Sequence, residues 1–558
     1  MPDQGSVFDY IVVGGGTAGV AIASRLSKYL PNCKIALFES GPDATHHPKV
    51  NDPNLWPSLI QEGLLVDYQT TPQVHLDDRV VPANLAGRLL SGSSGTNVGV
   101  WMRASRTDYD VIAKAAGHSR FTFEKLLPYF KRLENHWDVN AGSKYHGFSG
   151  PFRTVGGREY PLRQPILQSA ERLGIPYNPD SANGDPTGVS DLTQNFRIIS
   201  PSKSERQQSA KVYDLTRVHV ECDSPVARII VDTTGTAKGL ELVSGQKFHS
   251  RREVIISCGA HKTPQILLLS GIGPREELEK HRIPQILNSP AVGQNLHDHS
   301  QLTLFFKLRD PKKGQALPFN GTMKPEFGHG TPWEFNIFSH IPASELSPIL
   351  TSDGLPGVAD ETHSLLGNKR CHTMTMPIYF PIQANPLANP DIGIMAGTHV
   401  SFVALHLLPV SRGTIALKSA NPKDEPIIDP KFMSTNTDRY IIRRAIRDVL
   451  RLVETEPLAS ELDGEAPPLD HGHPALTSKS TDGEIDARVR RYVSTISHPM
   501  GTCALGKVLD TEFRVKGVKG LRVCDASVFP EPLGAMPMQT IYALAELCAD
   551  LIAGQAET

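Results

Sequence analysis

Long apolar runs and an excess of charge of either sign are both missing from this sequence. No stretch approaches the roughly 18 consecutive apolar residues of a membrane-spanning helix, and the polar first residues lack the apolar core of a secretory signal. The formal net charge is -2 over 558 residues, which indicates no basic surface for a phosphate backbone or an anionic membrane. We therefore expect a cytoplasmic protein that binds neither nucleic acid nor a membrane.

Cysteine is also scarce. The 7 cysteines are an odd number without C-x-x-C spacing, which favours reduced thiols over a disulfide framework, and we assign none of them a redox role. Hydrophobic residues make up 39% and charged residues 21% of the chain, as in an ordinary globular protein. The length exceeds what one hydrophobic core usually spans, so we expect two intertwined domains.

A dinucleotide-binding pattern opens the chain. Residues 8–13 form a short apolar run typical of a buried parallel strand, and a G-x-G-x-x-G pattern follows at once. Its glycines, Gly14, Gly16 and Gly19, allow a tight turn, close approach of a pyrophosphate and close packing of the next helix. Thr17 and Ala18 begin that helix, whose positive N-terminal end attracts the anion.

A second apolar run follows that helix and ends in an acid. Residues 35–38 precede Glu39 and Ser40, at the distance from the loop where a carboxylate accepts hydrogen bonds from the adenosine ribose. An acid at this place argues against a 2′-phosphate. The pattern does not by itself separate NAD from FAD, and a glycine-rich turn with no ligand is the alternative.

Four later segments resemble the glucose-methanol-choline (GMC) oxidoreductases. Residues 87–97 (GRLLSGSSGTN), followed by 103–110, resemble the first signature of that family, and residues 257–274 resemble the second. Residues 497–503 (SHPMGTC) are similar to its active-site segment and residues 521–527 to its last flavin strand. These motifs stand in the order of the family, and the likeness covers about residues 8–310 and 398–553.

The resemblance implies a mixed α/β fold with an FAD cofactor. A Rossmann-like FAD-binding domain would comprise residues 1–155, 200–300 and 495–558. It would be intertwined with a substrate domain of residues 156–199 and 301–494, an antiparallel sheet covered by helices. We expect strands of this sheet at 302–307, 402–409 and 413–418, and a covering helix at 439–455. Pro264 suits the first turn of another helix, and a final helix should span 537–553.

The resemblance also supplies further FAD-binding residues. They lie in the small-residue loop, in a strand that meets the adenine, in the second signature, in the last flavin strand and at the start of the final helix. They are Arg88, Ser91, Gly92, Ser94, Thr96, Asn97, Val98, Val226, Cys258, Gly259, Asp525, Ala526, Pro537 and Met538. An ordinary core valine at 226 and a structural turn aspartate at 525 are the alternatives.

His498 is the expected catalytic acid/base, since His-Pro-x-Gly-Thr matches the catalytic segment of the family. Oxidising an alcohol removes a hydroxyl proton while hydride leaves carbon for flavin N5. An imidazole that titrates near neutrality suits that proton transfer. The resemblance therefore implies an oxidase or dehydrogenase acting on CH-OH groups, with oxygen or another electron acceptor.

Met536 departs from the family, in which His or Asn at this position faces the same substrate oxygen. A thioether cannot donate a hydrogen bond to an alkoxide. Three alternatives follow in order: His498 suffices alone, Gln539 or a group of the central domain substitutes, or the chain is a flavin-bearing lyase or cyclase without net redox change. Met536 also makes the pocket more apolar, which favours a hydrophobic or aromatic alcohol, or a hydrated aldehyde.

Two further expectations concern ligands. Some relatives attach FAD to a histidine at the position of Thr96, so we predict noncovalent FAD here. His297 and His299 flank Asp298 in a ligand-like cluster, but the run matches a family segment, so we expect a role in structure and cofactor packing and no metal. Beyond a small-molecule substrate, we expect a monomer or homodimer.

Overall fold

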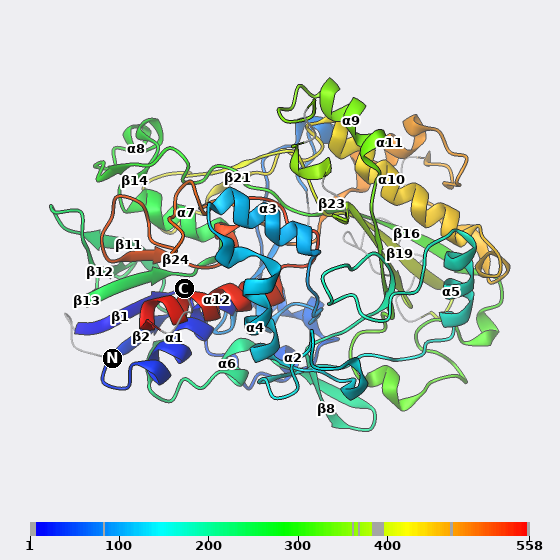
Figure 1. Ribbon diagram of the computed structural model, residues 1–558, viewed down its shortest axis with the longest axis horizontal. Coiled ribbons are helices and arrows are strands. Elements are labelled where there is room, and N and C mark those ends of the chain that lie inside the picture. Colours follow the sequence, from blue (N-terminus) through cyan, green and yellow to red (C-terminus); the bar gives the residue numbers. More distant parts are fainter. Residues whose placement is uncertain are drawn as a thin grey trace.

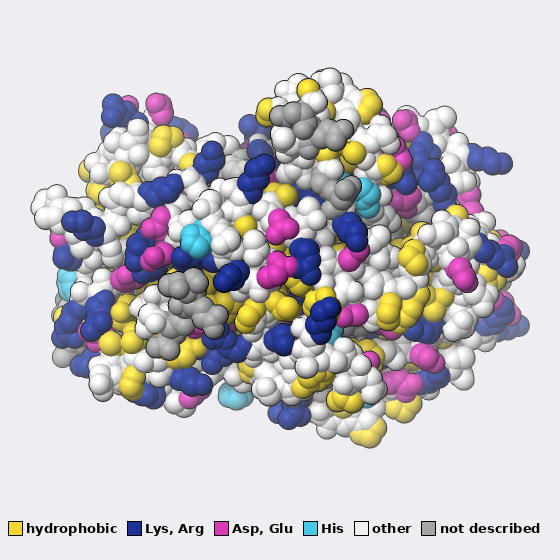
Figure 2. All heavy atoms as spheres, in the orientation of Figure 1, with side chains coloured by type: hydrophobic (Ala, Val, Ile, Leu, Met, Phe, Trp, Pro, Cys, Tyr) yellow, Lys and Arg dark blue, Asp and Glu magenta, His cyan; other side chains and the backbone are white. Residues whose placement is uncertain are grey.

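Two seven-stranded sheets organise the computed structural model, which describes residues 7–81, 84–359, 362–366, 369–381, 396–468 and 472–554. Figure 1 shows one sheet on the left and the other on the right. No helix within these ranges is long and apolar enough to cross a membrane. On the face in Figure 2, basic and acidic side chains are interspersed, as the small net charge predicts.

The first sheet has the strand order β10-β2-β1-β13-β12-β11, with β24 beside β13. Five strands run parallel: β1 (Val7–Val13), β2 (Ile35–Phe38), β10 (Val218–Glu221), β13 (Lys247–Ile256) and β24 (Leu521–Val523). The antiparallel strands are β11 (Val226–Val231) and β12 (Ala237–Leu242). Because β1, β2, β13 and β24 end at one edge, the segments after them meet there, where open α/β sheets bind ligands.

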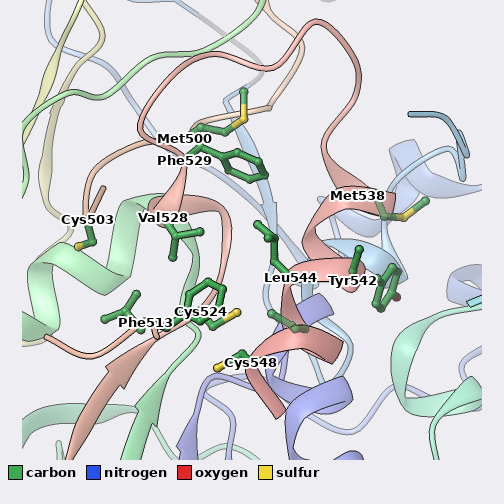
Figure 3. Close-up of a cluster of buried hydrophobic side chains, with 14 of the residues drawn as sticks. Met500, Cys503, Phe513, Cys524, Val528, Phe529, Met538, Tyr542, Leu544 and Cys548 are labelled. Atoms are coloured by element: carbon green, nitrogen blue, oxygen red, sulfur yellow. The ribbon is translucent and has the colours of Figure 1, made fainter. Parts of the chain in front are cut away.

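Helices α1 (Thr17–Tyr29) and α12 (Met538–Ala553) lie side by side against this sheet, in blue and red in Figure 1. Arg25 of α1 forms an ion pair of 2.8 Å with Glu546 of α12, a fully buried carboxylate. Figure 3 shows the apolar cluster beneath, where Cys524 after β24 meets Cys548 of α12. Helix α12 is thereby part of the hydrophobic core around the first sheet.

The second sheet is antiparallel, with the order β22-β16-β19-β18-β17-β7 and β23 beside β16. Its strands are β7 (Gly188–Asp191), β16 (Ser300–Leu308), β17 (Phe335–Ser339), β18 (Thr373–Ile378), β19 (His399–His406), β22 (Leu462–Glu465) and β23 (Ser494–Thr495). Helix α10 (Asn436–Val453) covers one face, where Leu302 and Leu304 enter its core. The predicted fold class is confirmed.

The remaining described elements are shorter or peripheral. The helices are α2 (Pro48–Asn51), α3 (Arg106–Ala116), α4 (Phe123–Leu133), α5 (Arg163–Arg172), α6 (Ser209–Val212), α7 (Gly259–Leu269), α8 (Arg275–Lys280), α9 (Ala343–Ser352) and α11 (Asp482–Tyr492). The strands are β3 (Leu65–Asp67), β4 (Leu85–Gly87), β5 (Glu134–Asn135), β6 (Phe152–Arg153), β8 (Phe196–Ser200), β9 (Lys203–Arg206), β14 (Ile272–Gly273), β15 (Leu287–Asn288), β20 (Thr414–Ala416) and β21 (Ile427–Asp429).

Two local predictions were wrong. Strand β20 pairs with β21 in a separate two-stranded sheet, outside the substrate sheet. Helix α7 begins at Gly259, so Pro264 lies in its second turn. Proline there leaves the Ala260 carbonyl without its helical N-H partner, and the Thr502 hydroxyl donates to that carbonyl at 2.7 Å. A tertiary contact thus compensates for a proline inside the helix. The local sequence alone suggests that the helix starts at this proline.

Candidate active site

A cavity of about 700 Å³ connects the dinucleotide loop with His498. Most of the predicted site residues line it, from the edge of the first sheet to the segment after β23. They are Gly14, Gly16, Thr17, Ala18, Glu39, Ser40, Arg88, Gly92, Thr96, Asn97, Val98, Val226, Cys258, Gly259, His498, Asp525, Ala526, Met536, Pro537 and Met538. Residues predicted from distant segments are therefore brought to one site.

The three loop glycines are required for different reasons. A Cβ on Gly14 would lie 2.5 Å from the Ser257 carbonyl oxygen, and one on Gly19 would lie 1.9 Å from that of Gly14. A Cβ on Gly16 would meet no protein atom closer than 3.9 Å. Protein packing therefore accounts for Gly14 and Gly19, whereas Gly16 leaves space beside the start of α1, which has no side-chain cap. That space fits a pyrophosphate.

Glu39 is 6% exposed at the edge of the same loop. One carboxylate oxygen accepts from the Gly15 N-H and the other from the Gly41 N-H, both at 2.8 Å. Burial raises the pKa of Glu39, while these backbone hydrogen bonds act in the opposite direction. The oxygen bonded to Gly41 also accepts from the Ser40 hydroxyl at 3.1 Å, while the oxygen bonded to Gly15 keeps a lone pair that suits a ribose hydroxyl.

The small-residue loop is packed directly against the dinucleotide loop. The Ser91 N-H donates to the Gly15 carbonyl at 2.7 Å, with Ser91 at φ +100°. A Cβ on Gly92 would lie 2.7 Å from the Gly16 Cα. Ser94 hydrogen-bonds the Ser91 carbonyl. Ser91 and Ser94 are not among the described cavity-lining residues, so they support this loop from behind.

Asp525 joins the last flavin strand to α7. One carboxylate oxygen accepts from the Gly259 N-H at 2.9 Å and from the Thr263 hydroxyl at 2.6 Å, and the other accepts from the Ser527 N-H at 2.7 Å. These bonds are those of a structural turn aspartate, while the residue also lines the cavity. Nearby, burial raises the pKa of Cys258, whose thiol donates to the Val13 carbonyl at 3.2 Å.

Asp298 fixes the turn that carries His498. Its carboxylate accepts from the His498 N-H at 2.9 Å and, through the other oxygen, from the Thr495 hydroxyl. The Thr495 oxygen in turn accepts from the Ser497 N-H at 2.7 Å, with Ser497 in the left-handed region at φ +60°. Burial raises the pKa of Asp298 to about 7. The Asp298 carboxyl group that holds this turn is therefore itself buried.

His299 selects the tautomer of His498. The Nε2 of His299 lies 2.9 Å from the Leu533 carbonyl, which can only accept, so this nitrogen carries the proton. Burial lowers the pKa of His299 to about 4, so its Nδ1 is an acceptor at neutral pH. That Nδ1 lies 3.1 Å from Nδ1 of His498. His498 therefore donates through Nδ1 and keeps the lone pair on Nε2.

The electrostatics agree with a neutral base. Desolvation inside the protein, followed by the proximity of His299, holds the pKa of His498 well below its usual range. At neutral pH the ring can therefore accept a proton from a hydroxyl group. The sequence analysis assigned the His-Asp-His run to structure and cofactor packing. It did not identify Asp298 and His299 as supports of His498.

Met536 lines the cavity and is 5% exposed, whereas Gln539 is not among the described residues that line it. In the amide orientation that satisfies both partners, Gln539 donates to the Met102 carbonyl and accepts from the Trp101 indole, both at 3.0 Å. This is a role in the core of the first domain. The structure gives no support to Gln539 as a substitute for the second catalytic residue.

One other cluster has the composition of a metal site. Ligand atoms of Glu134, His136 and His146 lie within 4.8 Å of one another. The Arg103 guanidinium, fully buried, contacts the Glu134 carboxylate at 3.0 Å. Burial opposes protonation of His146, but hydrogen bonds to Asp180 and Glu134 raise its pKa to about 9. Arg103 and His146 thus already pair with the Glu134 carboxylate, and His146 also pairs with Asp180.

Comparisons with known proteins agree with this geometry. Models of the GMC oxidoreductase family match residues 8–301 and 409–545. The chain is 40% identical to the GMC-type oxidoreductase acuG of Aspergillus aculeatus over 98% of this chain and 99% of that protein. It is 30% identical to choline oxidase of Arthrobacter globiformis over 98% and 94%.

Solved structures give the same result. Formate oxidase of Aspergillus oryzae superposes with a TM-score of 0.85 at 26% identity, covering 99% of each chain. Pyridoxine 4-oxidase superposes with a TM-score of 0.80 at 25% identity, covering 97% of this chain and 98% of that one. The chain belongs to the GMC oxidoreductase family and is an FAD-dependent enzyme that acts on CH-OH groups.

Proposed function

We propose that this enzyme oxidises a hydrophobic or aromatic alcohol, or a hydrated aldehyde, with His498 as the base. The observation that carries the proposal is the hydrogen-bond chain from the Leu533 carbonyl through His299, which leaves the lone pair of His498 on Nε2. When bound, FAD supplies the hydride acceptor at N5. The imidazole takes the hydroxyl proton, and Asp298 holds the backbone of the turn during this transfer.

The second sheet supplies an apolar wall for the substrate. Eight cavity-lining residues lie on or beside this sheet and are called here the substrate wall. They are Gln301, Thr303, Thr331, Trp333, Met376, Ile378, Phe380 and Val403. Five of the eight are apolar, and none is ionisable. Met536 and Met538 extend the apolar surface at the start of α12, which favours a hydrophobic or aromatic substrate.

We infer that His498 acts without a second hydrogen-bonding residue at position 536. Met536 cannot donate to the substrate oxygen, and the amide of Gln539 is engaged by Trp101 and Met102. The relatives above are named as oxidases or oxidoreductases. The lyase or cyclase alternative finds no support among them.

The proposed FAD site uses the loop of Gly14, Gly16 and Gly19 for the pyrophosphate, Glu39 for the ribose and Val226 for the adenine. The loop of residues 91–97 and Pro537 would meet the flavin. Thr96 at the attachment position supports noncovalent binding. The cytosolic location, the monomeric or dimeric state and the identity of the electron acceptor stay predictions.

The decisive experiment is an anaerobic titration of the purified enzyme with aliphatic and aryl alcohols, followed by flavin absorbance. Bleaching by an aryl or long-chain alcohol supports the proposal. A product formed while the flavin stays oxidised would replace it with the lyase or cyclase. The same titration with a His498→Ala variant that retains FAD should show no bleaching on the same timescale.

A further inference from the structure

We infer that the substrate carries a second, uncharged polar group, a hydroxyl or a carbonyl, which Gln301 and Thr303 bind while its alcohol carbon faces His498. The inference rests on the proposed function and specifies its substrate class. It starts from the polar residues of the substrate wall, which interrupt an otherwise apolar surface.

Strand register places these two side chains on the cavity face. Gln301 and Thr303 alternate along β16 with Leu302 and Leu304, which point into the opposite core. Thr303 pairs with Val403 of β19, and Val403 pairs with Met376 of β18. These three cavity-lining residues therefore form one row across the sheet, with a hydroxyl at one end and apolar side chains beyond it.

The polar atoms of this face have unused bonding capacity. The Gln301 amide nitrogen donates over 3.3 Å to the Thr495 carbonyl, while no described residue donates to its Oε1. No described residue is hydrogen-bonded to the Thr303 hydroxyl. Thr331 accepts from Gln194 at 2.7 Å and can still donate its own proton. The wall thus offers an acceptor and two hydroxyl donors to a ligand.

A group that completes these bonds is favoured over an apolar one, because a bound apolar surface would leave the amide oxygen and the hydroxyl unpaired. The contact with Thr495 also links Gln301 to the segment that leads to His498. The second polar group would therefore lie beside the reacting alcohol, on the side of β16. Since no residue of the substrate wall is a carboxylate, a quaternary ammonium alcohol would find aromatic rings there, Trp333 and Phe380, but no counter-charge.

The test compares benzyl alcohol with 3- and 4-hydroxybenzyl alcohol and choline, using kcat/KM of the holoenzyme. One hydroxybenzyl alcohol should exceed benzyl alcohol by about 10-fold or more. Gln301→Leu and Thr303→Val should each lower the ratio of kcat/KM for that compound to kcat/KM for benzyl alcohol by about 2- to 10-fold, the effect of one neutral hydrogen bond. Thr375→Val, a buried position of β18 outside the cavity lining, is the matched control.

The outcomes separate this inference from the proposed function. Equal kcat/KM for benzyl and both hydroxybenzyl alcohols would overturn the inference and leave the alcohol oxidation in place, as would a preference for choline. Absence of flavin bleaching with every alcohol would overturn both. If a variant loses FAD, the comparison of substrates with the unaltered enzyme still decides, because it needs no substitution.

Discussion

Nδ1 of His299 lies 3.1 Å from Nδ1 of His498, and Nε2 of His299 lies 2.9 Å from the Leu533 carbonyl. The carbonyl fixes the proton of one ring, and that ring fixes the proton of the next. The Leu533 carbonyl, in the loop before Met536, thus determines through His299 which nitrogen of His498 can accept a proton.

His299→Ala should lower kcat by about 100-fold, because the His498 ring then loses its orienting partner. FAD content should be unaffected, since His299 does not line the cavity. His299→Asn supplies an amide oxygen that can accept from His498, so it should recover part of the lost rate. Rapid-reaction flavin reduction measures both. Equal rates for the alanine variant and the unaltered enzyme would contradict the positioning role.

His498→Ala should lower the rate of flavin reduction by about 100- to 10,000-fold, the usual contribution of a general base. The variant should retain FAD, because the His498 ring that it lacks lies at the substrate end of the cavity. Absorbance of the purified variant checks cofactor retention, and stopped-flow reduction checks the rate. Retained FAD with undiminished reduction would remove His498 from the mechanism.

Titration of His498 should contribute no acid limb to the pH profile near pH 6.5. Burial and His299 lower the pKa of His498 well below its ordinary value, so the neutral, proton-accepting form persists as pH falls through 6.5. We expect His498 itself to lower kcat/KM only at distinctly lower pH, and a loss near pH 7 would be assigned to protonation of Asp298. Because the unfolded chain binds more protons at such buried histidines, acid also destabilises the fold below pH 6.5. Return of activity on neutralisation distinguishes titration from unfolding.

Gly16→Ala and Gly14→Ala should have different effects. The new methyl group at 16 meets no protein atom within 3.9 Å, so the apoprotein should keep its melting temperature while FAD binding weakens. At 14 the methyl group would lie 2.5 Å from a carbonyl oxygen, at a φ of +99°, and should destabilise the fold itself. Apoprotein melting and FAD titration compare the two. Unchanged FAD affinity in Gly16→Ala would argue against a pyrophosphate at this place.

Acid precipitation should release the flavin into the supernatant. Thr96 stands where some relatives attach FAD to a histidine, and its hydroxyl hydrogen-bonds the Ser93 carbonyl. The measurement is the absorbance of supernatant and pellet after precipitation. Colour retained in the washed pellet would contradict noncovalent binding.

Local sequence patterns predicted several elements of the first domain, because strand, glycine turn and helix are contiguous there. Residues 8–13, 35–38 and 537–553 are within one residue of β1, β2 and α12. The start of α7 was misplaced because the partner of the freed Ala260 carbonyl is Thr502, which lies far along the chain. The pairing of β20 with β21 is likewise set by tertiary context.

His498 could be proposed as the base from its motif, but the residues that support it could not be predicted. The contact between His299 and His498 joins segments 199 residues apart, and the Leu533 carbonyl lies 234 residues beyond His299. A backbone carbonyl carries no sequence signature. The role of Gln539 also depends on Trp101 and Met102, which a pattern around Met536 does not reveal.

Strand β24 and helix α12 complete the first sheet and the first core from the last part of the chain. During synthesis on the ribosome, β1, β2 and β13 emerge hundreds of residues before β24, so residues 254–256 of β13 lack this partner strand until β24 has been made. Exposed strand edges invite association with other chains. The interval before α12 emerges is therefore the period in which we expect the nascent chain to depend most on chaperones.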